Sequence, residues 1–169
     1  MARTVTLLRH GKSSWADPAL ADFDRPLAPR GRRASKLIAK HLRKAKVRPA
    51  LVLCSPAIRA RETLEAIRPV LGDAPVELEP RLYAAPSEEL LERLRAVADS
   101  VDSVLLIAHN PGLQDLALAL AANEADRARL REKFPTGALA TFTAKGKSWS
   151  ALGPGTAELV DYVVPRDLE

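Results

Sequence analysis

The chain has 169 residues, of which 47% are hydrophobic and 28% charged, and these proportions are typical of a soluble globular protein. A chain of this length is expected to form a single domain over residues 1–169. Its 26 Lys and Arg residues against 21 Asp and Glu give a net charge of +5, but aromatic residues make up only 4%, so we expect no nucleic-acid surface of interleaved basic and aromatic side chains. No apolar run reaches the roughly 20 residues of a membrane-spanning helix, and the N-terminus lacks a signal-peptide pattern, which predicts a cytoplasmic protein without a membrane partner.

Apolar runs and helical patterns alternate along the chain. The first half is expected to contain the strand Thr4–Leu8, a loop at Asp17–Pro29, a helix at Gly31–Lys44, the strand Leu51–Cys54 and a helix that ends near Arg68. Ser55 and Pro56 suit the N-cap and the first position of that second helix. The second half is expected to contain the strand Val76–Leu78, the helix Ser87–Ala98, the strand Val104–Ala108, helices at Leu113–Ala122 and Glu124–Lys133, and strands at Ala138–Thr143 and Ala157–Val164. The alternation predicts an α/β fold, a three-layer αβα sandwich with a mostly parallel central sheet.

The densest basic stretch runs from Arg30 to Arg48. Its basic residues alternate with the apolar residues Ala34, Leu37, Ile38 and Leu42, which indicates an amphipathic helix with a solvated basic face. A docking surface for an acidic partner, or for phosphate groups, is the alternative interpretation of that face.

Two residues with reactive side chains are expected to have structural roles. His41 lies within the basic helix and is interpreted as structural or solvated. Cys54 is the one cysteine, which excludes an internal disulfide framework and a multi-cysteine metal site. Because it lies in an apolar run, we expect an inert buried thiol.

Three of the expected strands end in residues that are able to do chemistry. The first ends in Arg9-His10-Gly11, the second in Ser55 with Arg59 one helical turn later, and the fourth in His109-Asn110. Ligands of open α/β sheets bind beyond the carboxyl ends of the strands. If these strands are neighbours, two imidazoles and two guanidiniums meet at one edge of the sheet.

Such a group of side chains suits a phosphoryl group. Guanidiniums are rigid bidentate donors to phosphate oxygens, and helix N-termini after Ser55 and Asn110 would add backbone N–H donors. A neutral imidazole can attack phosphorus and carry it as covalent phosphohistidine. The arginines supply the positive charge that a metal would otherwise bring, so neither a metal nor a cofactor is expected.

Three motifs carry a resemblance to a known family. "LLRHGKSSW" (Leu7–Trp15), "SPAIRARET" (Ser55–Thr63) and "VLLIAHNPG" (Val104–Gly112) are similar, in this order, to the motifs of the histidine phosphatase, or phosphoglycerate mutase-like, superfamily. The short chain, the segment "DFDRPL" (Asp22–Leu27) and the His-Asn pair most resemble the SixA-type phosphohistidine phosphatases. The resemblance implies a phosphoglycerate mutase-like fold and phosphatase activity.

Carried over to this sequence, the resemblance implies His10 as the nucleophile. Arg9, Arg59 and His109 would bind the phosphoryl group, with His109 also able to donate a proton. Further substrate contacts are expected from residues beside the two histidines, namely Gly11, Lys12, Ser13 and Asn110.

The sequence departs from relatives of this superfamily at the general acid. Many have an Asp after the second histidine, where this chain has Asn110, and others take a Glu from a longer insertion that nothing in Glu77–Leu91 matches. Glu79, Tyr83 and Glu88 remain as candidates, each with an ordinary structural interpretation. Mutase-like relatives also have a phosphate-binding Asn where this chain has Ala16.

A missing acid bears on the substrate. An alkoxide leaving group needs a proton in the transition state, whereas the imidazole of a phosphohistidine is protonated in advance from solution. We therefore expect the substrate to be phosphohistidine on a protein, of the phosphorelay or phosphotransfer type. A broad phosphatase for small phosphate esters is the alternative, and a non-catalytic phosphate-binding or docking module is an alternative of another class.

Overall fold

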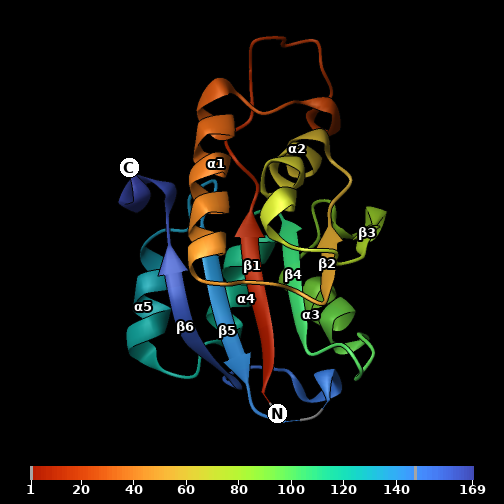
Figure 1. The fold of residues 1–169 in the computed structure, drawn as a ribbon, viewed down its shortest axis with the longest axis vertical. Coiled ribbons are helices and arrows are strands. Elements are labelled where there is room, and N and C mark those ends of the chain that lie inside the picture. The colour runs from red at the N-terminus through yellow and green to blue at the C-terminus, as the bar shows by residue number, and fades with distance from the viewer. Residues whose placement is uncertain (1, 147) are drawn as a thin grey trace.

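The protein is described by a computed structural model covering residues 2–146 and 148–169. Its centre is one six-stranded sheet between two layers of helices (Figure 1). The strands occur in the order β3-β2-β4-β1-β5-β6. Their bounds are β1 Arg3–Arg9, β2 Leu51–Cys54, β3 Val76–Leu78, β4 Ser103–Ala108, β5 Leu139–Ala144 and β6 Ala157–Val163.

The sheet is parallel over its first four strands. β3 pairs with β2, β2 with β4 and β4 with β1 in parallel, whereas β5 runs antiparallel to both β1 and β6. The arrowheads of β1, β2 and β4 therefore point to the same end of the molecule, which also carries the long loop between β1 and α1 (Figure 1). The predicted α/β architecture with a mostly parallel sheet is confirmed.

Within the described part of the chain, five α-helices cover the two faces of the sheet. One face carries α1 and α2, and the other carries α3, α4 and α5 (Figure 1). Their bounds are α1 Pro29–Lys44, α2 Ile58–Ile67, α3 Ser87–Arg95, α4 Gly112–Leu120 and α5 Glu124–Glu132. Because both faces of the central strands are covered, their alternate residues enter two hydrophobic cores. In β4, for example, Leu106 faces the core under α3 and α4, whereas Leu105 faces the core under α1 and α2.

The second helix begins later than its capping signals predict. The N-cap of α2 is Ala57, so Ser55 is not an N-cap and Pro56 is not the first helical residue. The Ser55 hydroxyl accepts from the backbone N–H of Ala57 at 3.3 Å and also lies 2.7 Å from Nε2 of His109, a partner distant in sequence. The helix predicted to reach Ala98 ends at Arg95, and the other boundaries differ by a few residues, as frayed element ends commonly do.

His41 and Cys54, which are expected to have structural roles, both lie outside the group of reactive side chains at the strand ends. His41 lies on α1, and its Nε2 is 2.7 Å from Oδ2 of Asp161 on β6. Cys54 is fully buried, and this burial raises the pKa of its thiol to about 12, so it is not a thiolate at neutral pH.

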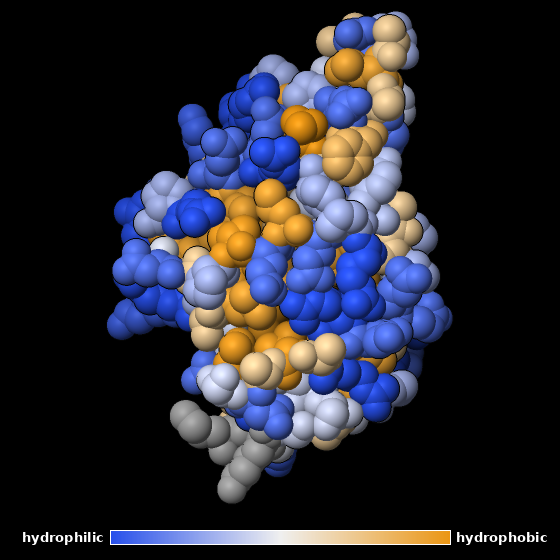
Figure 2. Space-filling view, turned by 90° about the vertical axis from the view of Figure 1, so that its right-hand side faces the viewer, coloured by the Kyte–Doolittle hydropathy of each residue, from blue (hydrophilic) through white to orange (hydrophobic). Residues whose placement is uncertain are grey.

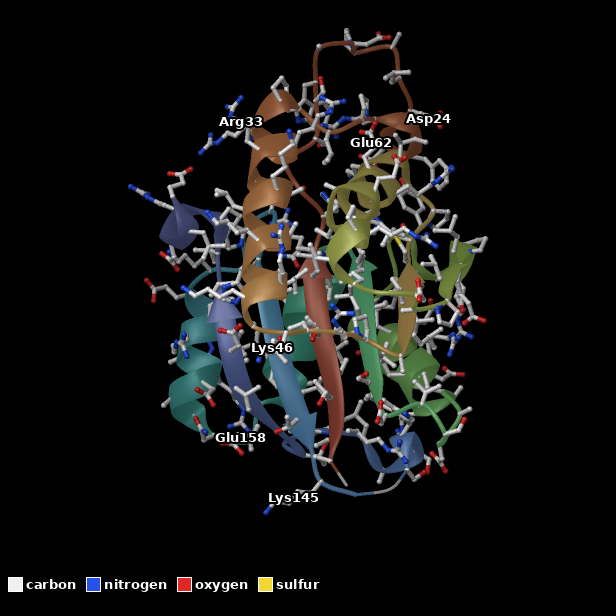
Figure 3. The ribbon with its side chains drawn as sticks, viewed as in Figure 1. Asp24, Arg33, Lys46, Glu62, Lys145 and Glu158 are labelled. Carbon is white, nitrogen blue, oxygen red and sulfur yellow. The ribbon has the colours of Figure 1, made fainter. Side chains whose placement is uncertain are left out.

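The face of the molecule on the β3 side of the sheet is mostly hydrophilic. Figure 2, which faces the β3 side of the sheet, shows polar residues over most of this face with hydrophobic residues near its middle. In Figure 3 Arg33 projects outward from α1, and Lys145 lies at the opposite end of the molecule. No helix among the described residues has both the length and the apolar character needed to cross a membrane.

Candidate active site

The three strand ends that carry reactive residues meet at one edge of the sheet, because β1, β4 and β2 are adjacent parallel strands. Arg9 on β1 pairs with Ala108 on β4, and Ile107 pairs in turn with Cys54 on β2. The residues that follow these pairs open into a pocket of about 310 Å³. Its lining consists of Arg9, His10, Lys12, Ser13, Trp15, Arg25, Arg59, His109, Asn110 and Thr136. The two histidines and two arginines singled out in the sequence are thus brought together.

The ring of His10 is held in one tautomer by the backbone. Its Nδ1 lies 2.7 Å from the carbonyl oxygen of Gly11, and a carbonyl only accepts, so Nδ1 carries the proton. Nε2 then keeps its lone pair and accepts a hydrogen bond from Nε of Arg59 at 3.3 Å. An imidazole in this state presents an unprotonated nitrogen to the pocket.

The ring of His109 lies beside that of His10, with ring centroids 4.9 Å apart. Its Nε2 contacts the Ser55 hydroxyl, and its Nδ1 lies 3.5 Å from Nη2 of Arg59. Arg59 therefore reaches both imidazoles with different nitrogens. Since Ser55 fixes one ring nitrogen of His109, the other is directed at Arg59 and the first imidazole.

Both imidazoles are held neutral. Burial, helped by the charges of His109, Arg59 and Arg9, lowers the pKa of His10 to about 3, although its hydrogen bond to Gly11 acts in the opposite direction. Burial and then the charge of Arg59 lower the pKa of His109 to about 4. Two neutral rings beside two guanidiniums make a pocket whose net charge is positive, which suits an anion.

The titration of this pair provides a test. Because the protonated forms are disfavoured, we expect both imidazoles to stay neutral as the pH falls from 7 to 5, where an ordinary histidine with a pKa near 6.5 becomes charged. Nitrogen-15 NMR of the side chains checks this and also reports the Nδ1–H tautomer of His10. A titration midpoint near pH 6.5 for either ring would contradict the expectation, and the spectrum of His10→Ala assigns the signals.

The guanidinium of Arg59 is anchored on its outer side by Asp22. Nη1 donates to the Asp22 carbonyl oxygen at 2.6 Å, and Nη2 donates to its carboxylate at 2.9 Å. The Tyr83 hydroxyl donates to the same carboxylate oxygen at 2.6 Å. This bond from Tyr83, followed by the bond and charge of Arg59, lowers the pKa of Asp22 to about 2, so Asp22 is a carboxylate at neutral pH.

Arg9 reaches the pocket from the opposite side. Its Nη1 donates to the carbonyl oxygen of Phe134 at 2.9 Å. Its Nε is buried and has no hydrogen-bond partner within residues 2–146 and 148–169. Burial and the neighbouring Arg59 lower the pKa of Arg9, although a guanidinium stays charged throughout the ordinary pH range. Arg9 therefore offers a hydrogen-bond donor that has no protein acceptor, and it lies near the guanidinium of Arg59. Such an arrangement is suited to binding an anion.

The remaining predicted substrate contacts are placed differently from one another. Lys12 and Ser13 line the pocket, and the Ser13 hydroxyl accepts from Nη2 of Arg25 at 2.7 Å. Asn110 also lines the pocket, although its side chain bonds the Phe134 carbonyl and the backbone N–H of Gln114. Gly11 lies behind His10 and does not line the pocket. Its N–H donates to the Thr63 hydroxyl at 3.0 Å.

The site also contains residues that sequence reasoning did not assign. Asp22 lies in the quoted "DFDRPL" segment, but nothing local indicates that it reaches Arg59, 37 positions away. Trp15 is 73% exposed at the pocket rim, and the guanidinium of Arg25 lies 3.0 Å from the centre of its ring. These contacts come from the folding back of the β1–α1 loop, which has no periodic signal.

The three candidates for the general acid, Glu79, Tyr83 and Glu88, all lie outside the lining of the pocket. Glu79 forms a salt bridge with Arg93 at 2.7 Å, and Glu88 lies in the exposed first turn of α3. Tyr83 packs edge-on against the His109 ring with centroids 5.4 Å apart, yet its hydroxyl donates to Asp22. Among the described residues, no group of three or more His, Cys, Asp or Glu is arranged to hold a metal ion.

Comparisons with known proteins agree with this geometry. Residues 5–84 match the model of the histidine phosphatase superfamily (branch 1). An uncharacterized protein of Mycobacterium tuberculosis is 40% identical over 163 residues, covering 94% of this chain and all of that protein. The phosphohistidine phosphatase SixA of Escherichia coli is 34% identical over 142 residues, covering 82% of this chain and 84% of SixA.

A solved structure extends the likeness to nearly the whole fold. The putative phosphohistidine phosphatase SixA of Nakamurella multipartitia superposes with a TM-score of 0.87 at 30% identity, covering 98% of this chain and 97% of that one. Together with the sequence relatives and the paired histidines at the strand ends, this shows that the chain belongs to the histidine phosphatase superfamily.

Proposed function

We propose that the protein is a phosphatase that removes the phosphoryl group from phosphohistidine on a protein, through a covalent intermediate on His10. The observation that carries the proposal is the unprotonated Nε2 of His10, which accepts a hydrogen bond from Arg59 in an arginine-lined pocket beside a second neutral imidazole. A nucleophile in its reactive protonation state next to fixed cationic donors is the arrangement that phosphoryl transfer needs.

The proposed reaction has two steps. Nε2 of His10 attacks phosphorus, the P–N bond of the substrate breaks, and the substrate imidazole leaves with the proton it already carries. A water then attacks the phosphoryl group on His10, which releases inorganic phosphate and regenerates the imidazole. Arg9 and Arg59 stabilise the negative charge on the phosphoryl oxygens, and the neutral ring of His109 binds beside the same group.

The make-up of the pocket supports phosphohistidine over alkyl phosphate esters. None of the lining residues is an Asp or Glu, and the carboxyl of Asp22, with its pKa lowered to about 2, holds no proton to give at neutral pH. An alkoxide would therefore leave without help, whereas a protonated imidazole needs none. The likeness to SixA proteins, two of which are described as phosphohistidine phosphatases, supports the same substrate.

A substrate panel tests this proposal. We expect kcat/KM for a phosphohistidine-bearing protein to exceed that for sugar and nucleotide monophosphates by about 10²- to 10⁴-fold, the range that a general acid contributes. An aryl ester such as 4-nitrophenyl phosphate, whose leaving group needs no proton, should fall between them. Equal or better turnover of the alkyl esters would favour the broad phosphatase. Absence of turnover with every substrate would favour the non-catalytic module.

We propose Asp22 as a positioning residue for Arg59. Removal of its carboxylate leaves only the backbone carbonyl to hold the outer side of the guanidinium. Because this carboxylate is about half exposed, we expect Asp22→Ala to raise KM by roughly threefold to tenfold with a smaller change in kcat.

The matched variants for this test come from the same short segment. Asp22→Asn keeps one acceptor oxygen and should recover most of the loss. Asp24→Ala, an exposed residue two positions along, should behave as wild type (Figure 3). Unchanged kinetics in Asp22→Ala would show that Arg59 is positioned without it.

A further inference from the structure

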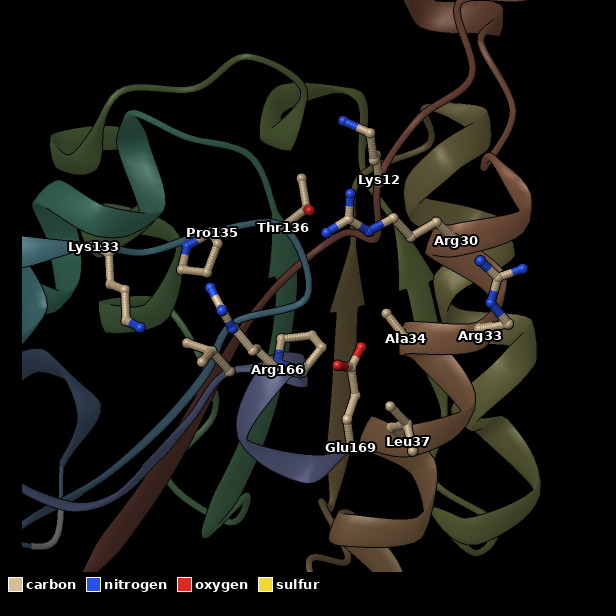
Figure 4. Close-up of a pocket in the computed structure, with 12 residues that line it drawn as sticks. Lys12, Arg30, Arg33, Ala34, Leu37, Lys133, Pro135, Thr136, Arg166 and Glu169 are labelled. Carbon is tan, nitrogen blue, oxygen red and sulfur yellow. The ribbon is translucent and has the colours of Figure 1, made fainter.

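A second and larger hollow lies next to the phosphoryl pocket. Its volume is about 700 Å³, and it lies between the first turns of α1, the segment around Pro135 and the C-terminal turn (Figure 4). We call it the basic groove. It is lined by Lys12, Arg30, Arg33, Ala34, Leu37, Lys133, Pro135, Thr136, Val164, Pro165, Arg166 and Glu169.

The cations of the basic groove are not used by the fold. Five of its lining residues are Lys or Arg and one is acidic. None of these five cations has a carboxylate within salt-bridge distance among the residues that the structure describes. Figure 4 shows Arg30, Lys133 and Arg166 extending toward the space between the segments that carry them. Unpaired cations that converge on one concave surface attract an anionic partner.

The basic groove is continuous with the phosphoryl pocket. Lys12 and Thr136 line both hollows. A polypeptide whose phosphoryl group lies against His10 can therefore continue past these two residues into the groove. The basic face that the sequence indicated on α1 has two parts. Arg30 and Arg33 face the groove, whereas Lys36 and Lys40 are exposed outside it.

We propose that the basic groove binds an acidic segment of the phosphorylated protein substrate, beside its phosphohistidine. This deepens the proposed function and rests on it. The groove has more than twice the volume of the phosphoryl pocket, and its cations are exposed side chains from separate segments above apolar residues such as Ala34 and Leu37. Such a surface fits glutamate and aspartate side chains along a polypeptide better than it fits one compact anion, which needs converging buried donors.

Two peptides of equal length test the groove. Each carries one phosphohistidine, flanked on both sides by glutamates in the first and by glutamines in the second. At low ionic strength we expect the wild-type chain to favour the acidic peptide by about tenfold in kcat/KM, and this preference should vanish in high salt. The double variant Arg30→Glu, Arg166→Glu should reduce the preference to twofold or less. Its effect on turnover of the glutamine peptide should be no larger than that of an equal change in net charge outside the groove.

A control variant has the same change in net charge. Lys36→Glu, Lys40→Glu alters two exposed residues of α1 outside the groove and should keep the tenfold preference. Glu at position 30 lies in the first turn of α1, where the helix dipole favours an acid, so the groove variant should fold. A preference that persists in the groove variant, or that disappears equally in the control, would overturn the proposal.

Binding is measured separately so that the two proposals can fail independently. Fluorescence anisotropy of the labelled peptides with the His10→Ala chain reports the same preference without turnover. Groove-dependent binding without hydrolysis of either peptide by the wild type would refute phosphohistidine as the substrate but would support the groove as a binding site for acidic peptides. Hydrolysis of both peptides with no dependence on the groove would support the proposed substrate and refute the role of the groove. Groove-dependent binding of tripolyphosphate, but not of the acidic peptide, would identify a small polyanion as the occupant and refute the proposal.

Discussion

Replacement of His10 by alanine is expected to lower kcat by on the order of 10⁴- to 10⁶-fold, because it removes the unprotonated Nε2 that is the proposed nucleophile. The arginines and His109 would remain, so binding of inorganic phosphate should be weakened far less than turnover. The measurement is single-turnover kinetics on a phosphohistidine protein, together with phosphate binding by calorimetry.

The covalent step gives this prediction a second readout. Wild-type chain quenched with denaturant under mildly alkaline conditions during turnover should carry an acid-labile phosphate, and His10→Ala should carry none. His41→Ala is the matched control, because His41 lies in the last turn of α1, contacts Asp161 and does not line the pocket. That variant should lose about 1 kcal/mol of stability at most and keep its activity. Turnover by His10→Ala within tenfold of wild type would show that the mechanism is wrong.

Arg59→Ala is expected to lower kcat/KM by about 10²- to 10³-fold, equivalent to about 3–4 kcal/mol of transition-state stabilisation. Arg59 is buried. It contacts His10 through Nε, both His109 and the Asp22 carboxylate through Nη2, and the Asp22 carbonyl oxygen through Nη1. Arg59→Lys should recover little, since an ammonium is a point charge and cannot make these contacts at once. Arg61→Ala, an exposed arginine on the same helix, should be close to wild type.

Loss of Arg59 should also move the pH profile. Its charge lowers the pKa of both His10 and His109, so its removal raises both values toward 6.5. The protonated, non-nucleophilic form of His10 then appears at higher pH, and the acidic limb of the kcat/KM profile should shift upward. A rate loss without such a shift would mean that Arg59 acts on the phosphoryl group alone and has little influence on the imidazoles.

Much of the fold is predictable from the sequence because its signals are local. The apolar run Val104–Ala108 and the Arg-His-Gly after Leu8 each indicate a strand that ends in reactive residues. Alternation of strands and helices then implies parallel neighbours whose carboxyl ends meet at one edge. The sequence therefore predicts that these histidines and arginines lie at one site.

Other features depend on contacts between residues far apart in the chain. Ser55 has every local property of an N-cap, yet its hydroxyl contacts His109, 54 positions away. Asp22 and Trp15 reach the pocket through a loop without periodicity. The basic groove joins α1 to the C-terminal turn. No local pattern encodes such pairings, because they depend on which surfaces the packed helices and loops bring together.

Local sequence signals are sufficient to predict the α/β fold, the four central side chains of the candidate site and the inert burial of Cys54. The tautomer of His10, the anchoring of Arg59 by Asp22 and the division of the basic face of α1 depend on the tertiary structure. The physical reason is that strand and helix signals arise from neighbouring residues, whereas protonation states and charge pairing arise from the atoms that folding places around a group.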